Sequence, residues 1–129
     1  MELPGFDSDF PQVVLIGGSS GVGKTIIARE LAKRLSVSLL LLDDVRLALQ
    51  AATTSETHPD LHVFLNYPTE QWKDSEAIFR DLIKVGRIMV EPLRAIIHHH
   101  LIVPDVGWII IEGDGILPNS CCRWIPRDI

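Results

Sequence analysis

The sequence has little cysteine and no excess of basic residues. Its two cysteines, Cys121 and Cys122, are adjacent, so they form neither a disulfide framework nor a metal pair with ligand spacing. Acidic residues outnumber basic ones by 17 to 12, and the formal net charge of -5 argues against a surface that coats nucleic acid. We therefore expect a reduced, cytoplasmic compartment and no nucleic-acid partner.

Long apolar runs are also missing. No run approaches the roughly 20 residues that cross a membrane, so no membrane partner is expected. The apolar segment Val13–Ile16 is too short for a secretory signal, and the residues before it are acidic rather than basic. The 129 residues are 47% hydrophobic and 22% charged, a composition typical of a globular protein. A chain of this length has enough residues for one domain with its own core, and we expect a single domain over residues 1–129.

The most informative stretch is a glycine-rich loop that matches the pattern G-x-x-x-x-G-K-[ST]. It follows the apolar segment Val13–Ile16, which predicts a buried strand, and precedes apolar residues at helical spacing over Thr25–Leu35. In that order, backbone N–H groups of the loop point inward at the N-terminus of a helix, where anions are favoured. The pattern predicts a loop that binds ATP or GTP, made of Gly18, Ser19, Ser20, Gly21, Val22, Gly23, Lys24 and Thr25.

Two side chains of this loop have predicted roles. Lys24 is expected to reach the β- and γ-phosphates, which makes it a candidate catalytic residue as well as a nucleotide ligand. The hydroxyl of Thr25 is expected to hold Mg²⁺. ATP and Mg²⁺ are therefore the predicted cofactors. An ordinary glycine turn between a strand and a helix is the alternative, and the correct flanking elements make it the weaker one.

Two more apolar runs predict strands that end in carboxylates. Val37–Leu42 is followed by Asp43 and Asp44, and Trp108–Ile111 is followed by the stretch Glu112–Gly115. Ligands of open α/β sheets bind at the carboxyl ends of the strands, so these carboxylates are candidate site residues.

The rest of the chain predicts helices and one long loop. Helical spacing resumes over Val45–Ala51, and Ala52–Pro68 is a polar loop containing two histidines. Two helices are expected at Thr69–Ile83 and Gly86–Leu101, with the break at the glycine and a kink or a restart near Val90–Glu91 caused by the proline that follows. The alternation of strands and helices predicts an α/β fold with a parallel sheet, the three-layer α/β/α arrangement of P-loop NTPases.

Several of these polar residues have two interpretations. Asp43 is a candidate general base that positions a substrate hydroxyl, and this assignment leaves the N-cap of the following helix to Asp44. Arg46 either holds a substrate phosphate or is a solvated or ion-paired arginine. Glu112 is a candidate metal or water ligand, and Asp114 is either its alternative or a turn residue.

The histidines give weaker signals. Three consecutive residues of one helix point in different directions, so the stretch His98–His100 cannot chelate one ion. His58 and His62 lie in a loop that is a candidate wall of the acceptor pocket.

Three stretches together resemble a group of small P-loop kinases. These are G-G-S-S-G-V-G-K-T at Gly17–Thr25, D-D-V-R-L-A-L-Q at Asp43–Gln50 and E-G-D-G-I-L-P at Glu112–Pro118. The group is that of the 2-phosphoglycerate kinase-like proteins, with zeta toxins and chloramphenicol phosphotransferase as more distant relatives. The resemblance covers Val13 to Pro118. It implies a kinase-type transfer of the γ-phosphoryl group of ATP to a small hydroxyl- or phosphate-bearing metabolite such as 2-phosphoglycerate.

The resemblance also carries roles for individual positions. It implies that Asp43, after the second strand, acts on the acceptor hydroxyl, and that Glu112 steadies Mg²⁺ through water. Members of this group continue with two further strands and a lid that carries arginines, and nothing after Pro118 matches them. The sequence therefore predicts an irregular tail over 119–129, a chain truncated at its C-terminus, and self-association through an exposed sheet edge. A non-catalytic or defective nucleotide-binding module and a simple NTPase remain the alternative functions.

Overall fold

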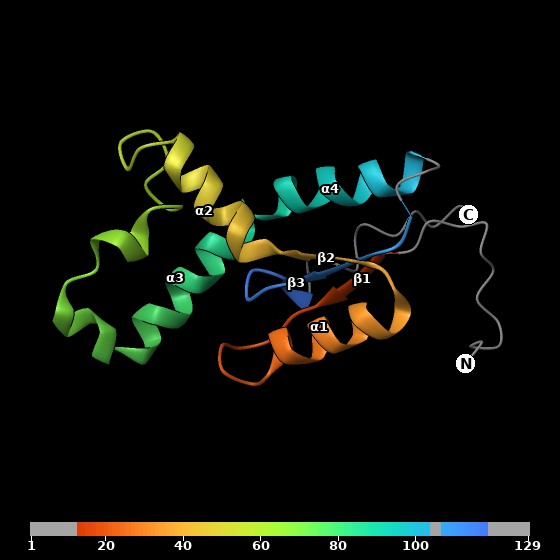
Figure 1. Ribbon diagram of the computed structural model, residues 1–129. Coiled ribbons are helices and arrows are strands. Elements are labelled where there is room, and N and C mark those ends of the chain that lie inside the picture. Colours follow the sequence, from red (N-terminus) through yellow and green to blue (C-terminus); the bar gives the residue numbers. More distant parts are fainter. Residues whose placement is uncertain (1–12, 104–106, 119–129) are drawn as a thin grey trace.

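A computed structural model describes residues 13–103 and 107–118 of the chain. It has an α/β arrangement with a small parallel sheet (Figure 1). The tail over 119–129, for which an irregular structure is predicted, lies outside the described residues. The strands are β1 (Val13–Ile16), β2 (Ser38–Leu41) and β3 (Ile109–Glu112). The α-helices are α1 (Lys24–Leu35), α2 (Leu42–Ala52), α3 (Ser75–Ile88) and α4 (Val90–Ile102), and the short 3₁₀ helices are η1 (Val63–Asn66) and η2 (Thr69–Lys73).

The three strands form one sheet in the order β1-β3-β2, and both pairings are parallel. The predicted parallel sheet is therefore confirmed. Glu112 at the end of β3 pairs in register with Ile16 on one side and Leu41 on the other. Because these residues end their strands, the segments that follow β1, β2 and β3 all leave the sheet at the same edge.

Helices pack on both faces of the sheet. On one face, Ile110 of β3 packs against Ala28 and Ala32, whose small side chains let α1 approach closely. On the other face, Ile109 and Ile111 pack with a larger cluster drawn mainly from α2, α3 and α4. Figure 1 shows α1 and α4 on opposite sides of the sheet. Strand β3 is buried along its whole length as a result, which explains the apolar run Ile109–Ile111.

Helix α2 begins immediately after β2, earlier than its apolar spacing predicts. Its N-cap is Leu41, with no side-chain hydrogen bond at the cap, so the assignment of Asp44 as the capping residue is wrong. Asp43 and Asp44 lie instead in the first helical turn, where a negative charge is stabilised by the helix dipole. The chain therefore turns from strand to helix without a polar linker.

Gly86 does not separate two helices, contrary to the prediction. It lies inside α3, and a Cβ atom at this position would come within 2.8 Å of Cδ1 of Leu117. The glycine thus makes room for the segment that follows β3. The break falls at Met89, and α4 begins at Val90, which confirms the restart predicted from the proline.

The segment between α2 and α3 is more ordered than a polar loop. It contains η1 and η2, and Asp74 caps α3 by accepting hydrogen bonds from the backbone N–H groups of Glu76 and Ala77. The predicted helix at Thr69–Ile83 is therefore wrong in its first part. Trp72 stacks on Phe64 with ring centroids 5.7 Å apart, and its ring meets that of Tyr67 edge-on. Among the described residues, no helix is long and apolar enough to cross a membrane.

A buried carboxylate ties this segment to α3. Asp81 is 3% exposed, accepts a hydrogen bond from the hydroxyl of Tyr67 and lies 3.1 Å from Nζ of Lys84. The hydrogen bond from Tyr67 holds the pKa of Asp81 below its usual range. A depressed pKa stabilises the fold above the pKa of the unfolded state and loses that effect as the pH falls through the folded value.

We predict that Asp81→Asn lowers the melting temperature near pH 7 by about 4–8 °C, the shift that loss of about 1 kcal/mol causes in a small domain. The difference from the wild type should begin to shrink below about pH 4, where the carboxyl group of the unfolded chain is protonated, and should shrink further as the pH falls through the lower pKa of the folded protein. Thermal melts between pH 3 and pH 8 measure this, with the exposed Asp60→Asn as the matched control. A difference that stays constant over that range would contradict the electrostatic explanation.

Candidate functional site

The loop between β1 and α1 has the backbone conformation that an anion site requires. Gly21 and Gly23 adopt positive φ angles of 80° and 94°, a region in which residues with a Cβ atom are strained. Gly23 is the N-cap of α1, and no side chain caps this helix. The first turn of α1 also contains no acidic residue. The positive end of the helix is therefore left for an external anion such as phosphate.

Lys24 is held inside this loop. Its side chain is 7% exposed, and its Nζ donates a 2.6 Å hydrogen bond to the carbonyl oxygen of Ser19. The same Nζ lies 2.6 Å from Oδ1 of Asp114, in the turn after β3. A buried ammonium group is costly unless it is paired, and these two oxygens supply the pairing. The loop thus carries one fixed positive charge.

The two residues predicted to hold the metal lie together. The Oγ1 of Thr25, in the first turn of α1, donates a 3.0 Å hydrogen bond to Oε2 of Glu112 at the end of β3. Glu112 is 5% exposed. A hydroxyl beside a buried carboxylate offers the hard oxygen ligands that Mg²⁺ prefers.

Within the described ranges, no three or more His, Cys, Asp and Glu side chains form a group that could hold a metal ion. A cation beside Thr25 and Glu112 would therefore take its other ligands from phosphate and water. Magnesium commonly binds in this way in phosphotransferases, so the residues fit the ion.

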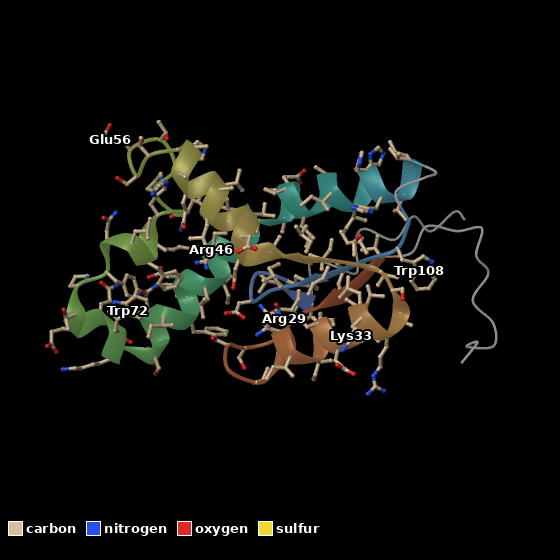
Figure 2. All side chains as sticks on the ribbon, in the orientation of Figure 1. Arg29, Lys33, Arg46, Glu56, Trp72 and Trp108 are labelled. Atoms are coloured by element: carbon tan, nitrogen blue, oxygen red, sulfur yellow. The ribbon has the colours of Figure 1, made fainter. Side chains whose placement is uncertain are left out.

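A cleft opens beside the glycine-rich loop, over the start of α2. Asp43 and Arg46 both line it, and Nη2 of Arg46 lies 3.5 Å from Oδ1 of Asp43. The Nε of Arg46 is buried without a hydrogen-bond partner among the described residues. Figure 2 shows this side chain in the region between α2 and α3. The lining residues are Leu42, Asp43, Arg46, Phe64, Leu82, Val85, Met89, Asp114 and Gly115.

The structure brings the predicted site residues into two adjoining groups. Lys24, Thr25 and Glu112 form a group at the glycine-rich loop, and Asp43 and Arg46 form a group in the cleft. Asp114 touches both, because it pairs with Lys24 and lines the cleft.

Sequence reasoning missed the apolar wall of the cleft. Phe64, Leu82 and Met89 come from η1, α3 and the break before α4, and no motif marks them. The two loop histidines lie elsewhere. His62 is 8% exposed and its Nε2 lies 2.9 Å from the hydroxyl of Thr53, while His58 contacts the hydroxyl of Thr57. Neither histidine lines the cleft.

Comparison with known proteins gives several similar sequences, each named 2-phosphoglycerate kinase. The protein from Pyrococcus horikoshii is 33% identical over 125 residues, an alignment that covers 81% of this chain and 39% of the relative. The protein from Methanococcus maripaludis strain C7 is 31% identical over 117 residues, covering 83% of this chain and 36% of the relative. The protein from Thermococcus kodakarensis is 45% identical over 51 residues, covering 39% of this chain and 18% of the relative.

These similarities support a relation to a kinase family. The chain spans about two fifths of the length of the first of these relatives. No family model matches it. No solved structure gives a significant match either. The α/β fold with its parallel sheet is compatible with a P-loop kinase.

Proposed function

We propose that this chain binds ATP with Mg²⁺ at residues 18–25 and transfers the γ-phosphoryl group to a small acceptor in the adjoining cleft. The observation that carries the proposal is the position of Asp114, which pairs with Lys24 of the loop and also lines the cleft beside Asp43. A nucleotide phosphate on Lys24 would therefore be next to a molecule in the cleft. The similarity to 2-phosphoglycerate kinases supports the same reaction class.

Each site residue has its own role in the proposed transfer. Lys24 would bind the β- and γ-phosphates, and Thr25 with Glu112 would hold the ion that neutralises charge on the transferred group. The acceptor oxygen attacks the γ-phosphorus, the bond from this phosphorus to the β–γ bridging oxygen breaks, and ADP leaves. The proton of the acceptor hydroxyl passes to a carboxylate oxygen of Asp43, which is half exposed and faces the cleft.

Arg46 favours an anionic acceptor. Its guanidinium group lines the cleft, and its buried Nε is an unused donor. A planar guanidinium group binds phosphate or carboxylate through paired hydrogen bonds, and such charge-assisted bonds are the stronger kind. A phosphorylated hydroxy acid carries both the anion for Arg46 and the hydroxyl for Asp43. We therefore propose this class of acceptor, with 2-phosphoglycerate as the first to be tested.

We predict that 2-phosphoglycerate increases ADP release above the rate with water alone, and that glycerate does so less because it lacks the phosphate. A coupled assay for ADP, run with ATP and Mg²⁺ and with each acceptor in turn, measures this. ADP release that no acceptor increases would instead indicate a simple NTPase. Binding of ATP without ADP release would indicate a non-catalytic nucleotide-binding module.

A further inference from the structure

The ion pair between Lys24 and Asp114 contains two residues from distant parts of the chain. Lys24 begins α1 and is 7% exposed, while Asp114 lies in the turn after β3 with a side chain that is 31% exposed. Their charged atoms are 2.6 Å apart. Glu112, at the end of β3, has a different partner, because it accepts a hydrogen bond from Thr25. Asp114 is thus the counterion of the lysine in the phosphate loop.

This ion pair occupies the ammonium group of Lys24, which is the group expected to bind the phosphates of a nucleotide. The ammonium of Lys24 has three N–H donors, and its two contacts are with the carbonyl of Ser19 and the carboxylate of Asp114. An ionised carboxylate only accepts hydrogen bonds, so Asp114 cannot donate one to a phosphate. A phosphate that approaches Lys24 meets a negative charge already in contact with it. The carboxylate and the phosphates therefore compete for one ammonium group.

We propose that Asp114 is a positioning residue that holds Lys24 in the nucleotide-free loop and thereby lowers the affinity for ATP. This inference rests on the proposed function only in that residues 18–25 bind a nucleotide. The pair keeps the buried lysine charge compensated when no phosphate is present. Binding of ATP then requires the ammonium group of Lys24 to give up or share its contact with the carboxylate of Asp114.

Titration calorimetry with ATP tests the proposal, in Mg²⁺ and again with Mg²⁺ chelated. Asp114→Asn removes the charge with little change in shape, and we expect it to bind ATP about 3–10 times more tightly than the wild type. Asp44→Asn is the matched control, because Asp44 is exposed and its loss changes the net charge equally. We expect the control to remain within about twofold of the wild type. A residue with a purely structural role would not tighten binding when replaced.

Measurements in the Lys24→Met variant distinguish competition for the ammonium group from a general repulsion between Asp114 and the phosphates. In Lys24→Met the ammonium group is absent, so Asp114→Asn should now change ATP affinity no more than Asp44→Asn does. A tightening that persists in this background would overturn the proposal. If binding to Lys24→Met is too weak to measure, denaturant unfolding of the nucleotide-free proteins provides a double-mutant cycle. Additive effects of Lys24→Met and Asp114→Asn there would also overturn it.

Failure of this inference is distinguishable from failure of the proposed function. Equal or weaker ATP binding by Asp114→Asn, with the wild type still binding, overturns the inference alone. If Asp114→Asn binds ATP more weakly than the wild type in Mg²⁺ but not when Mg²⁺ is chelated, Asp114 is a metal ligand, and the inference is overturned as well. Absence of ATP binding in both proteins overturns the nucleotide site and the inference together, whereas binding by Asp114→Asn alone supports both. Circular dichroism confirms folding, and Asp114→Ala replaces the asparagine variant if that one unfolds.

Discussion

Replacement of Lys24 by alanine is expected to weaken ATP binding at least tenfold while the fold is retained. A charge-assisted contact with phosphate is worth about 1.5–3 kcal/mol, and about 1.4 kcal/mol corresponds to a factor of ten in affinity. The loss also leaves Asp114 without its lysine. Asp114 is 31% exposed, so water can hydrate its charge and unfolding is not expected.

Titration calorimetry of the wild type and Lys24→Ala measures this difference, and circular dichroism checks the fold. Lys33→Ala is the matched control, because Lys33 lies exposed on the same helix and its loss changes the net charge equally. The control should bind ATP with the affinity of the wild type. Equal affinities of Lys24→Ala and the wild type would exclude the predicted phosphate loop.

The parts of the fold that could be predicted are those that local sequence determines. The apolar runs of the three strands gave the parallel sheet, because a strand covered on both faces is apolar at nearly every position. The loop after β1 was predictable for a similar reason. Gly21 and Gly23 adopt backbone angles that other residues avoid, so the conformation is encoded by the glycines themselves.

The predictions that were wrong concern positions whose role in the fold depends on tertiary contacts. Gly86 has the sequence signature of a helix break, yet its missing side chain accommodates Leu117, which is distant in sequence. The aspartates after β2 have the signature of a helix cap, yet α2 begins before them, at Leu42, and this residue is buried in the core. Sequence alone indicates that a residue is unusual without indicating which neighbour requires it.

The same distinction applies to the candidate site, where some contacts could be predicted from sequence and others could not. Residues at the ends of parallel strands meet at one edge, so the proximity of Thr25 to Glu112 could be predicted from topology. The pairing of Lys24 with Asp114 could not, because a carboxylate between two glycines carries no signal for its orientation. The apolar wall of the cleft comes from η1, α3 and the break before α4, where no motif is present. The roles of these residues stay predictions.

The replacement Asp43→Asn is expected to lower the rate of phosphoryl transfer by about 10²–10⁴-fold, the usual loss when a general base is removed. Asparagine keeps the size and hydrogen-bonding shape of Asp43 but has no charge and accepts no proton. Asp43 lines the cleft, and the contacts of the phosphate loop are made by other side chains. ATP affinity should therefore change by less than about 1 kcal/mol.

The assay for ADP release with a phosphorylated hydroxy acid measures the rate, and titration calorimetry measures ATP affinity in the same preparation. Asp44→Asn is a closely matched control, because Asp44 is the next residue of the same helical turn, bears the same charge and is exposed outside the cleft. It should retain the wild-type rate. If Asp43→Asn instead weakens ATP binding as much as Lys24→Ala, then Asp43 belongs to the metal site or the fold. Activation of the acceptor hydroxyl would then fall to Glu112 or Asp114, the other carboxylates at this edge of the sheet.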